Sequence, residues 1–196
     1  MKSKDAKGGA APHEPERVAQ AWVELRSEDP EAVSAFGIAR ARLAAGRTLV
    51  SLRRLRLFEL RGALPARDEL EALLHRSIQF YNPHKERCRV RLEAGDPAPV
   101  GADETMVLVT RRGDEERPAA ERWWRHQTQR DVDVREGVVW ALRFAEGTDA
   151  AAAARELALL TDRHRGLLCN PHAQTMDVAE GSTPLPWMDR VTRGDA

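Results

Sequence analysis

The 196-residue chain lacks several features that mark whole classes of protein. Its 31 basic and 31 acidic residues give a formal net charge of zero, so it has no basic excess with which to displace counterions from nucleic acid. No stretch approaches the roughly 20 apolar residues that cross a bilayer. No apolar segment follows the N-terminal lysines, as it would in a signal peptide. We therefore expect a cytoplasmic protein that binds neither nucleic acid nor membranes.

Cysteine and the glycine-rich motifs are equally scarce. Cys88 and Cys169 are too few for a disulfide framework, and the glycines form neither a P-loop nor a dinucleotide-binding fingerprint. Nucleophilic catalysis requires a base beside the nucleophile, and only His164 and His172 lie close to Cys169 in sequence, without an enzyme signature around them. We therefore expect no catalytic residue and no cofactor.

The residues that are present indicate a packed core between two tails. Hydrophobic residues make up 42% of the chain, and the tails over residues 1–17 and 181–196 are irregular, the first of them disordered. We expect Trp187 and Met188 to pin the second tail to the body. Between the tails, apolar residues recur alternately at strand and helix periods. In the unit over residues 18–94, we expect strands at 21–26, 49–60 and 88–92, and helices at 30–45 and 68–75.

Local signals support these boundaries and a second copy of the series. Asp29 is placed to cap the first helix, with Pro30 at its first position. The run Arg53-Arg54-Leu55-Arg56 is typical of a solvated strand face. Residues 95–104 are rich in turn formers and predict a linker. In the unit over residues 105–180, we expect strands at 106–110, 134–144 and up to 178, and helices at 118–128 and 150–165.

Both units close on the same tripeptide, Asn82-Pro83-His84 and Asn170-Pro171-His172, with starts 88 positions apart. Asn tolerates left-handed backbone at the end of a helix, and Pro prevents the helix from continuing, so the motif fits a helix stop. Self-similarity at a fixed offset predicts a tandem duplication. If each long middle strand bends into two, each unit becomes a ferredoxin-like β-α-β-β-α-β sandwich. The sequence thus predicts an α+β protein of two such sandwiches, whose sheets stack as a pseudo-dimer.

The second unit resembles the PurS family, the small subunit of bacterial phosphoribosylformylglycinamidine synthase. The segments that carry the resemblance are Val107 to Gly113, Val134-Arg135-Glu136-Gly137, and Leu167 to His172. The first unit is similar to it through Val23 to Arg26, Asp29-Pro30 and Asn82-Pro83, so the resemblance covers about residues 20–180. The family usually has a lysine where Val138 stands, and Leu55 stands where the first unit would have the glycine.

The resemblance implies an accessory subunit without catalytic residues of its own. Such a subunit bridges the ATP-using synthetase and the glutaminase of a complex that makes the amidine of formylglycinamide ribonucleotide in purine synthesis. The residues that we assign to partner binding or structure are Asn82, Pro83, His84, Arg135, Gly137, Asn170, Pro171 and His172. Homo-oligomerisation stays open.

A second class of function also stays open. It is a ferredoxin-like interaction or regulatory module with no link to purine synthesis. In one variant of it, His84, Cys88, Cys169 and His172 supply the four ligands of a structural zinc ion. The duplication argues against this variant, because the two cysteines occupy different positions relative to the Asn-Pro-His motif.

Overall fold

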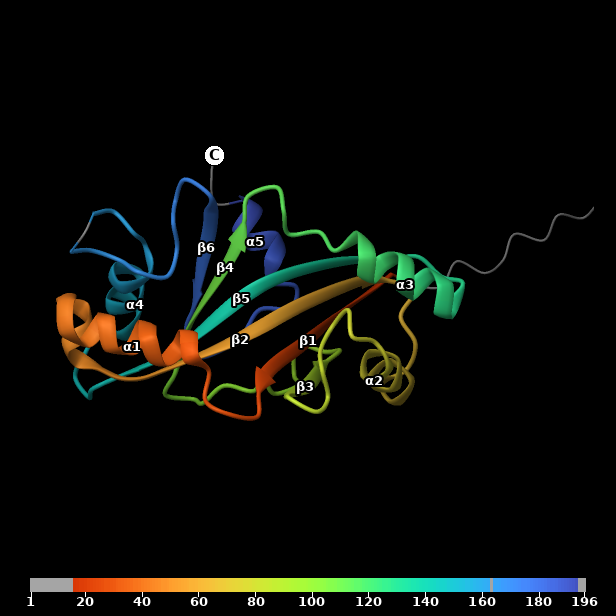
Figure 1. The fold of residues 1–196 in the computed structure, drawn as a ribbon, viewed down its shortest axis with the longest axis horizontal. Coiled ribbons are helices and arrows are strands. Elements are labelled where there is room, and N and C mark those ends of the chain that lie inside the picture. The colour runs from red at the N-terminus through yellow and green to blue at the C-terminus, as the bar shows by residue number, and fades with distance from the viewer. Residues whose placement is uncertain (1–15, 163, 194–196) are drawn as a thin grey trace, which may run out of the picture.

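Six antiparallel strands form one twisted sheet in the computed structural model, which describes residues 16–162 and 164–193 (Figure 1). The tail expected over residues 1–17 thus falls almost entirely outside the described residues. The order across the sheet is β3-β1-β2-β5-β4-β6. The strands are β1 (Arg17–Leu25), β2 (Leu49–Gly62), β3 (Glu86–Arg91), β4 (Thr105–Arg111), β5 (Val132–Phe144) and β6 (Gln174–Ala179).

Four helices cover one face of this sheet, which we call the helical face. They are α1 (Pro30–Arg42), α2 (Arg67–Arg76), α3 (Pro118–Thr128) and α4 (Ala150–Ala158), and a short 3₁₀ turn η1 (Ala45–Thr48) follows α1. Figure 1 shows α1 and α4 at one end of the sheet and α2 and α3 at the other. As predicted, Asp29 caps α1, its carboxylate accepting from the Glu31 and Ala32 backbone N–H groups. None of the helices in the described residues is long and apolar enough to cross a membrane.

Two separate cores lie under these helix pairs. The core beneath α2 and α3 joins Leu70 and Trp124 to β-strand residues such as Phe58. The core beneath α1 and α4 combines small helix residues, among them Ala35 and Ala154, with larger strand residues such as Leu142. Each helix pair therefore combines one helix from residues 18–94 with one from residues 105–180.

The strand pairing has an approximate two-fold arrangement. Val23 of β1 lies opposite Arg56 of β2, and Val109 of β4 lies opposite Val138 of β5. Arg56 and Val138 thus hold equivalent positions, and they also lie opposite each other in the β2–β5 ladder. We call this pair the ladder centre.

The predicted pair of four-stranded sandwiches is wrong. Each long middle strand stays unbroken, with 14 residues in β2 and 13 in β5, and the two pair with each other along nearly their whole length. Each half of the chain therefore contributes three strands to one shared sheet, and the described residues contain no second sheet that stacks on it. An edge-to-edge junction satisfies the backbone hydrogen bonds of both middle strands, which face-to-face stacking would leave at sheet edges.

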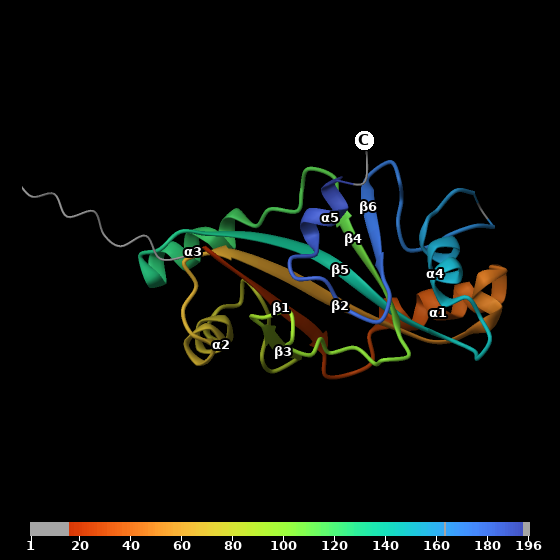
Figure 2. The ribbon, with the colours of Figure 1, turned by 180° about the vertical axis from the view of Figure 1, so that it is seen from behind.

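The opposite face of the sheet is covered by the C-terminal segment, which contains α5 (Met188–Arg193). Seen from behind, α5 lies against β4 and β6 (Figure 2). Trp187 and Met188 are buried there, as predicted, and Trp187 packs beside Trp22. The prediction of an irregular tail is wrong for this part of the chain, since it forms a helix and fills the third core of the protein.

The predicted helix over 150–165 is too long. The helix α4 ends at Ala158, and the next residue, Leu159, forms a bridge with Cys169. Gly166 has a φ of 77° and lies against the Leu159 carbonyl, where a Cβ atom would collide with backbone. The return of the chain at this point, rather than helix propensity, sets the helix end.

Candidate functional site

A polar cleft lies on the helical face, over the middle of the sheet between the two helix pairs. Its volume is about 480 Å³. The central cleft, as we call it, is lined by Glu31, Arg54, Arg56, Val109, Thr110, Arg111, Arg117, Glu136, Gly137, Val138, Trp140, Leu168 and Gln174. Four arginines and two glutamates line it, together with both residues of the ladder centre.

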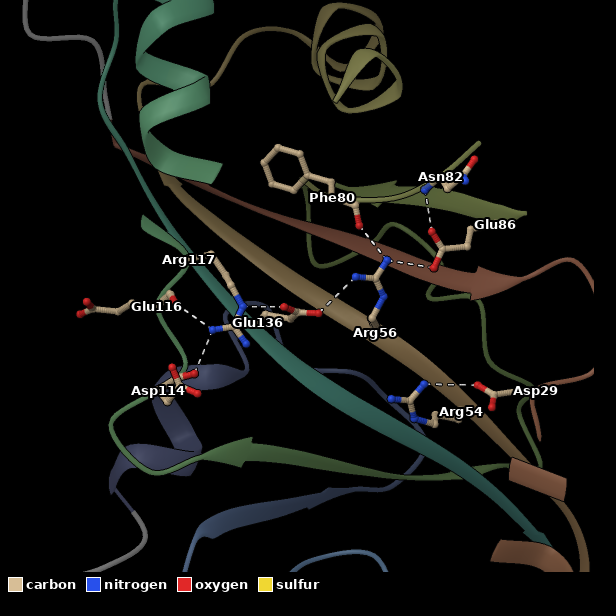
Figure 3. Close-up of polar contacts among 10 residues, drawn as sticks. All are labelled: Asp29, Arg54, Arg56, Phe80, Asn82, Glu86, Asp114, Glu116, Arg117 and Glu136. Atoms are coloured by element: carbon tan, nitrogen blue, oxygen red, sulfur yellow. Dashed lines mark hydrogen bonds and ion pairs between the residues drawn. The ribbon is translucent and has the colours of Figure 1, made fainter. Parts of the chain in front are cut away.

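Arg56, at the ladder centre, connects the two halves of the chain (Figure 3). Its Nη2 donates to the Phe80 carbonyl at 2.8 Å and to Glu86 Oε1 at 2.9 Å. Its Nη1 donates to Glu136 Oε1 at 3.4 Å, across the β2–β5 ladder. The guanidinium of Arg56 therefore holds the loop before β3 and the second half of the sheet with one planar group.

Glu136 extends this network to the start of α3. Its second oxygen accepts from Arg117 Nε at 2.5 Å, and Arg117 Nη1 also donates to the Asp114 and Glu116 carbonyls (Figure 3). Because Glu136 lies between Arg56 and Arg117, much of the charge in the central cleft is neutralised inside the protein. A connected network of ion pairs thus lines the central cleft.

The first Asn-Pro-His motif is attached to the same network. The Asn82 backbone N–H donates to Glu86 Oε2 at 2.6 Å, while the other oxygen of Glu86 binds Arg56. The Asn82 side-chain oxygen accepts from the His84 backbone N–H at 3.0 Å, which closes an Asx turn. Arg26 Nε donates to the Pro83 carbonyl.

The second motif is built with the same hydrogen bonds. The Asn170 backbone N–H donates to Gln174 Oε1 at 2.8 Å, and the Asn170 side-chain oxygen accepts from the His172 backbone N–H at 3.0 Å. Arg112 Nε donates to the Pro171 carbonyl, as Arg26 does in the first half. The motif therefore forms a turn that leads into an edge strand, and the expected helix stop is wrong: α2 ends at Arg76 and α4 at Ala158, well before either Asn.

Two other predicted site residues do not join the central cleft through their side chains. Arg135 lies on the opposite face of the sheet, where its Nη1 donates to Asp189 Oδ1 of α5 at 3.1 Å. Gly137 lines the cleft with backbone, since it has no side chain. A Cβ atom at this position would lie 2.8 Å from Leu108 Cδ1 and 3.2 Å from the Val109 carbonyl oxygen. The glycine thus permits β4 to approach β5.

The histidines and cysteines do not converge. The turns that carry His84 and His172 precede β3 and β6, which are the two opposite edges of the sheet. Among residues 16–162 and 164–193, no three His, Cys, Asp or Glu side chains are grouped as metal ligands would be. Burial raises the pKa of Cys88 to about 12, and burial also raises the pKa of Cys169, so neither thiol is set up as a thiolate nucleophile.

Sequence reasoning missed the residues that hold the central cleft together. Arg56 belongs to the run interpreted as a solvated strand face, but its side chain is only 28% exposed and binds three partners. The sequence did contain one signal for Arg56. This arginine directly follows Leu55, and Leu55 occupies the position in the first unit that corresponds to Gly137 in the second. Two adjacent tryptophans of α3 lie in the core beneath α2 and α3, where Trp124 is fully buried and Trp123 packs edge-on to Phe80.

Comparison with known proteins found no matching protein-family model, no matching curated protein and no matching solved structure.

Proposed function

We propose that the chain is a non-catalytic accessory subunit of the PurS type, with two fused units that bridge a synthetase and a glutaminase in phosphoribosylformylglycinamidine synthesis. One observation carries the proposal. The two halves repeat the same element order, and the two Asn-Pro-His turns are held by the same three hydrogen bonds. A tandem fusion of two such units, each of which contributes three strands to the shared sheet, is the simplest origin of such a repeat.

The geometry of the turns suits a bridging subunit. Each turn is rigid because backbone and side-chain bonds determine its shape, and the His84 and His172 side chains are exposed. The turns stand at opposite edges of one sheet, so two partners bound there would be held at a constant separation. Such a role requires no titrating group.

The proposal is tested with the purified synthetase and glutaminase subunits and with a deletion strain. We expect the full chain to form a complex with both subunits when glutamine and ATP are present, and its loss to cause a purine requirement. The double variant His84→Ala, His172→Ala should weaken complex formation by at least tenfold. His126→Ala, at an exposed position on α3, is the matched control and should have no effect.

Failure of both the binding arm and the deletion arm is decisive. If neither purified subunit binds the chain, and the deletion strain grows without purines, the assignment to purine synthesis is wrong. If binding is retained in the double histidine variant, the subunit assignment survives and the turns are structural only.

The second candidate function is an interaction module unrelated to purine synthesis. One feature favours it. A groove runs along β2 from Val50 to Arg54, where the pairing with β1 has ended, and Val33 and Phe36 of α1 line it. Bridging the two turns does not use this groove. This candidate predicts a polypeptide partner together with normal growth of the deletion strain without purines.

A further inference from the structure

The two halves differ at one strand edge, and the second half shows how that edge is filled. Residues 115–117 run beside β5 as a short extended segment, with Glu116 opposite Arg135. The Arg117 N–H donates to the Val134 carbonyl at 2.8 Å, and the Glu136 N–H donates to the Glu115 carbonyl at 2.7 Å. The part of β5 that β4 does not reach is therefore covered by the chain itself.

The first half has no such cover. The connection from β1 to α1 is residues 26–29, whereas the connection from β4 to α3 is residues 112–117, two residues longer. Glu28 and Arg53 are the equivalents of Glu116 and Arg135, yet no bridge joins them within the described part of the chain. The shorter connection does not reach back to the strand, and only side chains span the gap, such as Arg54 to Asp29 at 3.3 Å.

The outer edge of β2 along this gap has no strand partner among the described residues. In an antiparallel strand, every second residue directs its N–H and C=O to the same side. The backbone N–H and C=O groups of Val134 and Glu136 point away from β2. In the first half the equivalent residues are Leu52 and Arg54, so their backbone groups point away from β5. The pairing of β1 with β2 ends at Val23 and Arg56, so β1 does not cover those groups.

A groove of about 440 Å³ lies along this edge, and we call it the edge groove. One wall is β2 from Val50 to Arg54, and the other is Ser27 to Asp29. Val33 and Phe36 of α1 also line it, and Val33 and Val50 are 50% and 44% exposed. Apolar side chains beside an unpaired strand edge are the features of a β-augmentation site.

We propose that the edge groove binds an extended segment of a partner polypeptide, which adds to β2 at Val50–Arg54 and places apolar side chains at alternate positions against Val33 and Phe36. The occupant is extended because the second half fills its equivalent edge with extended backbone. Five residues of strand span about 16 Å, which is the length of a short linear motif. Because Ser27 to Asp29 line the far side, the groove admits one strand rather than the edge of a second folded copy.

The test uses the full chain as bait for a phage-displayed library of random 12-residue peptides. We expect enriched peptides with apolar residues at alternate positions, and we expect a bound peptide to slow amide exchange at Leu52 and Arg54. Val33→Asp and Val50→Asp should each weaken peptide binding by at least tenfold. Ile78→Asp, at a position 86% exposed and outside the groove, is the matched control and should leave binding unchanged.

A loop graft provides a second, independent variant. Replacing residues 26–28 by the sequence of residues 112–116 keeps the Asp29 cap of α1 and makes the connection two residues longer. The first half should then cover its own edge, which would abolish peptide binding without lowering the thermal midpoint. The proposal is wrong if no peptide is enriched, or if enriched peptides protect amides elsewhere. It is also wrong if the chain alone is a dimer that Val50→Asp dissociates, since a second copy then occupies the groove. None of these outcomes depends on a link to purine synthesis.

Discussion

A buried carboxylate holds the C-terminal segment to the sheet, and its neutral replacement should destabilise the protein measurably. Glu59 is only 5% exposed. Its Oε1 accepts from the Trp187 backbone N–H and from Gln20 Nε2, and its Oε2 accepts from the Met188 backbone N–H. Gln20 in turn accepts from the buried guanidinium of Arg91 at 2.7 Å. The negative charge of Glu59 is thus balanced by Arg91 through the amide of Gln20.

The perturbation is Glu59→Gln, which preserves size and removes the charge. An amide offers one acceptor oxygen, so at least one of the three donors loses its partner and faces an NH₂ group instead. An orphaned buried donor costs about 1–3 kcal/mol, and the remaining bonds lose their charge assistance, so we expect a total of about 2–4 kcal/mol. For a chain of this length, that loss lowers the melting temperature by roughly 5–15 °C.

Urea unfolding followed by tryptophan fluorescence measures this effect, because Trp187 and Trp22 are both buried beside the network. Glu156→Gln, on the exposed side of α4, is the control and should change the free energy of unfolding by less than about 0.5 kcal/mol. If Glu59→Gln also falls below that value, the carboxylate does not hold the segment and the reasoning is refuted.

Three further predictions concern single residues. Because burial raises the pKa of Cys88 from 9.0 to about 12, its thiolate fraction at pH 8 falls about 1,000-fold, and alkylation by iodoacetamide should be slowed accordingly; alkylation at the rate of a free thiol contradicts this. Gly137→Val should destabilise the protein by about 1–3 kcal/mol through collision with β4, whereas Gly95→Val, in open space, should not. Hydrogen bonds from the two backbone N–H groups after β3, together with Arg67, lower the pKa of Asp96. Its contribution is therefore present at neutral pH and lost as the pH falls through that lowered value, so Asp96→Asn should destabilise the protein at pH 7 but not in strong acid.

Local signals in the sequence were sufficient to predict most elements. Asp29 and Pro30 mark the start of α1, and the helix predicted over 118–128 has the observed bounds of α3. These features depend on neighbouring residues, since a cap or a proline acts within one helical turn. The repeat of the Asn-Pro-His motif was found for the same reason, although its role as an Asx turn leading into a strand requires the contacts of Glu86 and Gln174.

The long-range arrangement was not predictable from the same signals. An apolar run such as that of β2 is compatible with one long strand or with two short ones, and only the partner strand decides between them. The partner is β5, which lies in the other half of the chain and presents an unbroken edge of matching length. The central cleft was missed for the same reason: Arg56, Glu86 and Glu136 come from three strands, and no local pattern relates them.

A single chain also permits a difference between halves that two identical chains cannot have. In a symmetric dimer of one unit, a two-residue change in the connection after the first strand would open or close both edges together. Here the connection over residues 112–117 closes one edge, and the connection over residues 26–29 leaves the other open, while the bonds of the two Asn-Pro-His turns remain alike. The turns are therefore alike in the two halves, whereas the connections differ in length, and on our proposal this difference decides which half binds a partner. Exchanging the two connections should therefore transfer peptide binding from the edge of β2 to the edge of β5.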